Sequence, residues 1–139
     1  TTPVVISSGS TDWKQVACGN AHTVGIKTDG TLWTWGYNAY GQLGVNDTTN
    51  RSTPVVISSG ATDWKQVAGG GSHTAAIQTD GTLWTWGLNN NGQLGVNDTN
   101  GRTTPVTTFS TGTNWKQVAS GGYYASAITS GTDPTFFIT

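Results

Sequence analysis

Charged residues are scarce in this sequence, at 9% of its 139 positions. The six lysines and arginines stand singly along the chain, and the formal net charge at pH 7 is −1. A nucleic-acid-binding surface needs clustered lysine and arginine, so this composition argues against such a partner. No apolar run approaches the roughly 18 residues of a membrane-spanning helix. We therefore expect neither nucleic-acid binding nor membrane insertion.

Glutamate and methionine are missing altogether, and the single cysteine, Cys18, cannot form a disulfide within the chain. We expect this lone thiol to be a small buried side chain rather than a nucleophile. Threonine occurs 26 times and glycine 20 times, whereas long helix-forming side chains are few. This balance of β-branched and turn residues predicts an all-β fold. The low charge and abundant Thr, Asn and Gly also favour an extracellular or cell-surface location.

One phrase with paired tryptophans, GTLWTWGYNAYGQLGVND at 30–47, returns as GTLWTWGLNNNGQLGVND at 81–98. The period is 51 residues, and residues 1–51 and 52–102 are identical at 38 of 51 positions without a gap. We divide the chain, as a single segment 1–139, into repeat 1 (1–51), repeat 2 (52–102) and a partial repeat 3 (103–139). Repeats of this length indicate stacked units that cannot bury their faces alone.

Each repeat contains four short apolar runs typical of strands, which in repeat 1 are residues 2–6, 13–17, 22–28 and 31–36. The last two flank Asp29-Gly30, a hairpin-turn signal because glycine supplies the positive φ that tight turns need. Strict alternation in WKQVA would place Trp13, Gln15 and Ala17 on one face. Four strands per unit of this length predict the blades of a β-propeller.

The combined phrases resemble a repeat of the regulator of chromosome condensation family: W..VA.G..H, DG.L..WG.N..GQLG and the R.TP join. The resemblance covers nearly the whole chain. It implies blades of four antiparallel strands, about three per chain. It also implies that each TPV strand completes the preceding blade as its outermost strand. The ring is then completed by other copies or by a longer parent chain.

On this reading the two ends of the chain are complementary. The strand of Pro3, Val4, Val5 and Ile6 has no preceding blade in the chain, and no TPV strand follows Phe136, Phe137 and Ile138. Phe136 and Phe137 are expected to replace the paired tryptophans. We predict that these terminal strands are exchanged between copies, because exposed sheet edges invite pairing. Two alternatives are that the chain is an excised fragment of a longer propeller, or that three blades close on themselves.

No residue pattern predicts catalysis. His22 and His73 are equivalent, but Tyr124 takes that position in repeat 3, and no second ligand stands at zinc spacing. We expect these histidines to bond strands within a blade. No P-loop, nucleophile elbow or catalytic triad is present. We therefore expect no enzyme activity, no cofactor and no metal.

The aspartates have simple structural roles on this interpretation. Asp12, Asp63 and Asn114 precede the first tryptophan of each repeat, and we expect them to cap turns through nearby backbone amides. Asp29 and Asp80 lie in the predicted hairpin turns. Each loop offers only one carboxylate, too few for calcium.

The seven tryptophans raise the question of light sensing, because plant ultraviolet receptors share the resemblance. Their sensing tryptophan falls in a GWRHT phrase, where this sequence has Asn20 and Gly71. We therefore expect no photoreception. Large rings bury much area between layers, so we assign the paired tryptophans to the core: Trp33, Trp35, Trp84 and Trp86.

The repeats differ most in the segments between strands, which would lie on one face of a propeller. Tyrosine is enriched at interaction hot spots, so four tyrosines are the candidate anchors for an unknown protein or glycan partner: Tyr37, Tyr40, Tyr123 and Tyr124. The leading hypothesis is a self-associating, non-enzymatic interaction scaffold. The alternatives are a structural subunit of an extracellular ring or filament, and a fragment of a larger regulatory propeller of the GTPase-exchange or chromatin-binding type.

Overall fold

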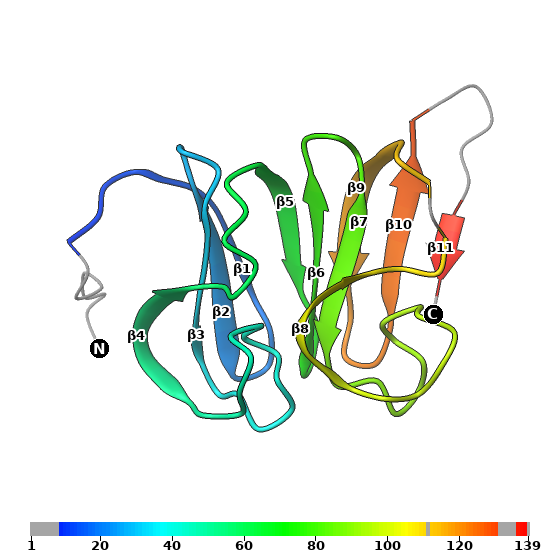
Figure 1. Cartoon of the computed structure of the whole chain (residues 1–139), viewed down its shortest axis with the longest axis horizontal. Helices are drawn as coiled ribbons and strands as arrows, with labels where there is room; N and C mark the ends of the chain where they lie inside the picture. The colour runs from blue at the N-terminus through cyan, green and yellow to red at the C-terminus, as the bar shows by residue number, and fades with distance from the viewer. Residues whose placement is uncertain (1–8, 111, 131–135, 139) are drawn as a thin grey trace.

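The computed structural model describes residues 9–110, 112–130 and 136–138, and every regular element there is a β-strand (Figure 1). Blade 1 contains β1 (Trp13–Cys18), β2 (His22–Lys27), β3 (Leu32–Gly36) and β4 (Arg51–Val56). Blade 2 contains β5 (Trp64–Gly69), β6 (His73–Gln78), β7 (Leu83–Gly87) and β8 (Arg102–Thr107). Blade 3 contains β9 (Trp115–Ser120), β10 (Ala125–Thr129) and β11 (Phe136–Ile138).

Each blade is an antiparallel meander, because strands that follow one another in the sequence pair with one another. The sequence repeats are offset from the blades. Pro54 lies in β4 and Pro105 lies in β8, and these strands are the outermost of the blade before each new repeat. The predicted offset is thus confirmed for both strands. The corresponding residues Pro3–Ile6 lie outside the described part of the chain.

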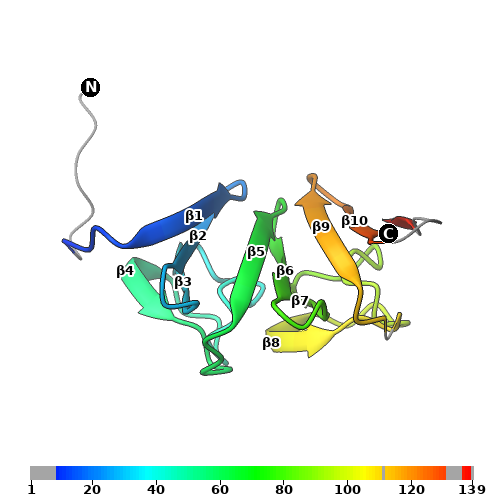
Figure 2. The ribbon, with the colours of Figure 1, turned by 90° about the horizontal axis from the view of Figure 1, so that it is seen from above.

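The first strands of the three blades, β1, β5 and β9, follow one another across the molecule, with their arrowheads on the same side (Figure 2). β5 contacts β1 on one side and β9 on the other. β4 and β8 lie on the opposite side of the molecule, so the blades fan out from these inner strands. The fan forms a sector of a propeller.

A β-bulge decides which side chains of an inner strand share a face. The register of β5 against β6 shifts between Trp64 and Gln66, and β1 shifts at the same place. Such a bulge adds a residue and reverses the alternation after it. Trp64 and Val67 therefore pack towards blade 1, whereas Ala68 packs towards blade 3. The expectation of strict alternation in WKQVA was wrong for this reason.

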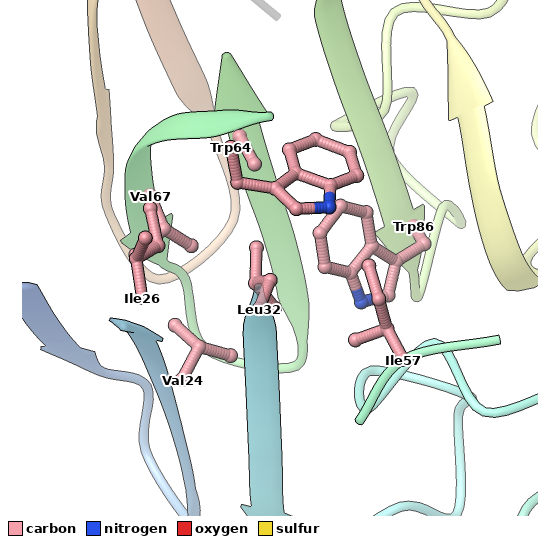
Figure 3. Packing of buried hydrophobic residues seen from close by; sticks show 8 residues of the cluster. Val24, Ile26, Leu32, Ile57, Trp64, Val67 and Trp86 are labelled. Atoms are coloured by element: carbon pink, nitrogen blue, oxygen red, sulfur yellow. The ribbon is translucent and has the colours of Figure 1, made fainter. Parts of the chain in front are cut away.

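The apolar core lies between the blades rather than within them. Between blades 1 and 2, the rings of Trp64 and Trp86 meet edge to face with centroids 6.1 Å apart (Figure 3). Around them pack smaller side chains from both blades: Val24, Ile26, Leu32, Ile57, Val67 and Ala76. Between blades 2 and 3 lies a second cluster: Ala68, Ala75, Ile77, Leu83, Trp115, Val118 and Ala127. Each sheet thus depends on a neighbour to cover its apolar face.

Position in the fan, rather than residue type, sets burial. Val67 and Val118 are 3% and 6% exposed, but the equivalent Val16 is 62% exposed because no blade packs on that side of blade 1 in the described chain. Trp35 is only half-buried for the same reason, whereas the equivalent Trp86 is buried. Trp33 and Trp84 are half-buried in both blades, so of the four tryptophans assigned to the core only Trp86 is fully buried. Cys18, predicted to be buried, is exposed at the end of β1.

The third strand of blade 3 pairs with its neighbour in the same register as the third strand of blade 1. Phe137 pairs with Ala127, as Trp33 pairs with Gly25 in blade 1. Phe136 pairs with Ile128, as Leu32 pairs with Ile26. Only Phe137 therefore takes a tryptophan position, and the expectation that both phenylalanines replace the tryptophan pair was wrong.

Candidate binding surface at the loop end of the blades

The loops after the first and third strands of each blade lie at the same end, which we call the loop end. The loop after β1 leads into His22, which pairs with Gly36 at the end of β3. Neighbouring blades are bonded here. The Asn20 N–H donates to the Gly71 carbonyl at 3.3 Å, and the Gly71 N–H donates to the Gly121 carbonyl at 3.2 Å. The first loops of all three blades therefore form one continuous row.

A ring lies over a glycine at this end of every blade. A Cβ at Gly19 would collide with the ring of His22, and one at Gly70 would collide with the ring of His73. In blade 3, Gly121 lies in the same way beneath Tyr124. The spacing G..H thus follows from the close approach of ring and backbone, which only glycine allows.

His22 bonds to the next blade rather than within its own. Its Nε2 lies 3.0 Å from Thr74 Oγ1, and that hydroxyl donates to the Gln42 carbonyl at 2.8 Å. Since the hydroxyl hydrogen goes to Gln42, Thr74 Oγ1 accepts the proton of His22 Nε2. The expectation of a bond within the blade was wrong for His22, because its ring reaches β6.

Both histidines are buried and neutral at pH 7. Burial lowers the pKa of His22 to about 4, and the nearby His73 adds to the effect because a second positive charge would repel the first. Burial likewise lowers the pKa of His73 to about 4. These rings are shielded from solvent, so they are unsuited to exchange protons with a substrate.

The long loop after β3 is fixed by a buried asparagine. Asn38 Nδ2 donates to the carbonyls of Asp47 and Thr49, and Asn38 Oδ1 accepts from the Leu43 N–H at 2.9 Å. Asn89 makes the same set of bonds in blade 2. The loop therefore presents its outer residues from a rigid frame.

Carboxylates tie the loops to the following strands. Arg51 Nη2 donates to Asp47 Oδ2 at 2.6 Å, and Arg102 repeats this bond with Asp98 at 2.7 Å. The hydrogen bond from Arg51 holds the pKa of Asp47 below its ordinary value. These pairs are exposed and contribute mainly to loop geometry.

The aspartates outside the long loops form two kinds of contact. Asp29, which was predicted to lie in a hairpin turn, accepts from the N–H and hydroxyl of Thr31 and so caps that turn. Asp63 instead accepts from Gln78 Nε2 at 2.9 Å, and Asp12 pairs with Lys27 at 3.5 Å. These two carboxylates reach the end of the second strand, so the expected capping through nearby backbone amides was wrong for them.

The GQLG phrase joins the loop of one blade to the next. The indole Nε1 of Trp86 donates to the Gln42 carbonyl at 2.9 Å. Gly44 lies against the same indole, so closely that a Cβ there would touch it. Trp86, the second tryptophan of its pair, therefore packs against the loop of the preceding blade.

A glutamine on β1 and another on β5 each clamp the inner strand of the next blade. Gln15 Nε2 donates to the Val67 carbonyl at 3.1 Å, and Gln15 Oε1 accepts from the Val67 N–H at 3.2 Å. Gln66 Oε1 accepts from the Val118 N–H at 2.8 Å between blades 2 and 3. Sequence reasoning missed this contact, although the recurrence of Gln in every WKQVA phrase is the signal that could have revealed it.

The four candidate tyrosines all lie at the loop end. The rings of Tyr37 and Tyr40 meet edge to face, with centroids 6.3 Å apart. Tyr123 and Tyr124 belong to the first loop of blade 3. All four are exposed, between 41% and 69% of their surface. The structure thus forms one tyrosine pair on blade 1 and places the other two on blade 3.

Other kinds of site are not found in the described part of the chain. None of the described residues form a group of three or more His, Cys, Asp or Glu side chains able to hold a metal ion. No helix long and apolar enough to cross a membrane occurs among them.

Repeated four-stranded sheets that fan out from aligned inner strands, and bond to one another through loops and glutamines, define a β-propeller segment. The chain matches two family models described as "Regulator of chromosome condensation (RCC1) repeat", one over residues 29–77 and 80–128 and the other over 13–42 and 64–93. It belongs to the family of RCC1-repeat proteins.

Relatives with these repeats have varied names. The chain is 40% identical over 100 residues to the ultraviolet-B receptor UVR8 of Arabidopsis thaliana, covering 71% of this chain and 23% of the receptor. It is 40% identical over 93 residues to the probable E3 ubiquitin-protein ligase HERC3 of Homo sapiens, covering 66% of this chain and 9% of that protein. This chain therefore spans less than a quarter of these relatives.

Solved structures show the same fold. Human WBSCR16 matches with a TM-score of 0.78 at 25% identity, over 92% of this chain and 33% of that one. Yeast RCC1 (Prp20), in a structure bound to Kap60, matches with a TM-score of 0.79 at 20% identity, over 94% of this chain and 33% of that one. This chain corresponds to about a third of either propeller.

The two buried histidines make stability depend on pH. Their folded pKa of about 4 lies below the ordinary 6.5, so their contribution is complete above pH 6.5. It is lost as the pH falls from 6.5 towards 4, because the unfolded chain then binds protons that the folded chain does not. We expect the free energy of unfolding to fall over this range by on the order of 3 kcal/mol per histidine.

Urea unfolding at steps between pH 7 and pH 4 measures this slope. The double variant His22→Asn/His73→Asn should be less stable at pH 7 and should lose most of the slope. An equal slope in the variant and the parent would contradict the assignment to these two rings.

Proposed function

We propose that this chain is a non-enzymatic interaction scaffold that binds a protein partner at its loop end. The observation that carries the proposal is the exposure of four tyrosines on rigid loops. Tyrosine contributes a large apolar ring with one polar atom and loses little conformational entropy on binding. The buried Asn38 network fixes the loop that carries Tyr37 and Tyr40, which reduces the cost of ordering it.

Two solved structures support a protein rather than another partner class. Yeast RCC1 (Prp20) was solved bound to Kap60, and the crystal structure of Prp20p from Saccharomyces cerevisiae was described together with its binding properties to Gsp1p and histones. These partners belong to the yeast protein. We carry over only the partner class, because the chain covers about a third of either structure.

A binding role fits the chemistry of the chain better than catalysis does. His22 and His73 are buried and neutral, and the loop carboxylates Asp47 and Asp98 are paired with arginines. The ligase name of the HERC3 relative does not extend to this chain, since the match covers 9% of that protein. On composition, we also place the protein outside the cell or on its surface.

Binding can be measured by interferometry with the immobilised chain and three purified probes: yeast Kap60, Gsp1 and core histones. We expect at least one probe to bind, and the variant Y37S/Y40S/Y123S/Y124S to bind it at least about tenfold more weakly, because hot-spot residues contribute 2 kcal/mol or more. The control V56S removes an exposed apolar side chain from the outer strand β4 and should bind like the parent.

Two results would contradict the proposal: no binding of any probe, or equal weakening by the control variant. Binding to a glycan array that depends on the same tyrosines, without protein binding, would also count against it and would indicate a glycan partner.

We also propose that copies of the chain associate. β4 and β8 cover the outer edge of the third strand in blades 1 and 2, whereas β11 has no further strand beside it among the described residues. An uncovered edge of Phe136–Ile138 offers main-chain groups for pairing. The strand that would fill it is Pro3–Ile6 of a second copy, whose sequence matches Pro54–Ile57.

The solution mass tests this association. Light scattering coupled to size exclusion should give a mass of at least twice the 14.5 kDa of one chain. A single 14.5 kDa species at every concentration would contradict it. Electron microscopy separates a closed ring from the alternative, an open filament.

A further inference from the structure

The contact between neighbouring blades has a direction. In each pair, the earlier blade contributes the clamping glutamine and small side chains, and the later blade contributes a tryptophan, a valine and the valine main chain. Between blades 2 and 3, these are Gln66, Ala68 and Ile77 on one side and Trp115 and Val118 on the other. The two sides differ, so the contact is head to tail.

Blade 3 has an uncovered copy of the first side. Gln117 and Ala119 are exposed and Ile128 is half-buried, at positions equivalent to Gln66, Ala68 and Ile77. With Ser126 and Ala127 they line a hollow of about 240 Å³. Where the equivalent residues of blade 2 lie, the space is filled by Trp115 and Val118.

Blade 1 has an uncovered copy of the second side. Val16 is 62% exposed, and Trp13, on the same face, is half-buried against Trp35 at 5.8 Å between ring centroids. The equivalent Val67 receives both hydrogen bonds of the Gln15 amide. No glutamine reaches the Val16 main chain among the described residues, since Gln15 and Gln66 clamp the blades that follow them.

We propose that blade 1 of a second copy docks on blade 3 through these two faces, with the Gln117 amide clamping the Val16 main chain. A second copy fits both faces, because they repeat the two sides of an interface that already forms twice within the chain. This proposal rests on the self-association proposed above and specifies its contact.

Two single variants, each blocking one face, test the direction of the contact. Val16→Lys places a charge on the blade 1 face, and Ser126→Arg fills the hollow on blade 3. Each variant alone should run at the mass of one chain. An equimolar mixture should recover a species of twice that mass, because one intact face of each kind remains. The control Val56→Lys, on the outer strand, should keep the parent mass.

A conservative variant tests the clamp itself. In the parent chain, hydrogen exchange at the Val16 amide, followed by NMR, should slow at least about tenfold as the concentration rises to where copies associate. In Gln117→Leu it should not slow. The Val67 amide, already clamped by Gln15, should be protected at every concentration in both proteins.

The outcomes separate this inference from the proposal beneath it. A monomeric parent overturns both. If the parent chain associates and both face variants keep the mass of the parent, the contact through the glutamine clamp is contradicted. Association through the edge strands then remains. A mixture of the two face variants that stays monomeric overturns the head-to-tail direction, provided that circular dichroism shows both variants folded.

Discussion

The structure depends on one contact, the packing of each blade against the next through the inner strands. A four-stranded sheet of about 40 residues cannot bury enough apolar surface alone, so tryptophan and valine from one blade must be covered by alanine and isoleucine from another. The glutamine amide of one blade fixes how the next blade is placed against it. Its two hydrogen bonds to a main-chain valine fix the register of one inner strand against the next, which apolar packing by itself would leave loose.

The loop end follows from the same stacking. The buried His22, the carbonyl of Gln42 and the indole of Trp86 connect blade 1 to blade 2 at this end. Because these bonds hold the loops in place, the residues between them are free to vary. The tyrosines lie among the variable positions, on a frame that does not change. A repeat protein can thus acquire a binding surface without altering its core.

Much of the fold could be predicted from the sequence, because period, turn residues and the TPV join are local signals. The bulge after Trp64 could not, since it changes the facing of Val67 without changing the composition of the strand. Residues at equivalent positions of the repeats also differ in burial. Cys18 and Val16 are exposed because, in the described chain, no blade covers that side of blade 1. The candidate tyrosines were found from differences between repeats, whereas the glutamine clamp, identical in every repeat, was missed.

The central claim is that the glutamine amide holds neighbouring blades together, and the most direct measurement is the unfolding free energy of three matched variants in dilute solution. Gln15→Leu and Gln66→Leu should each lower it by about 1–2 kcal/mol, because main-chain groups of the next blade lose their partners. Gln117→Leu, in the same phrase WKQVA but with no following blade in the described chain, should lower it by less than about 0.5 kcal/mol. Equal effects at all three positions, or none at Gln15 and Gln66, would contradict the account.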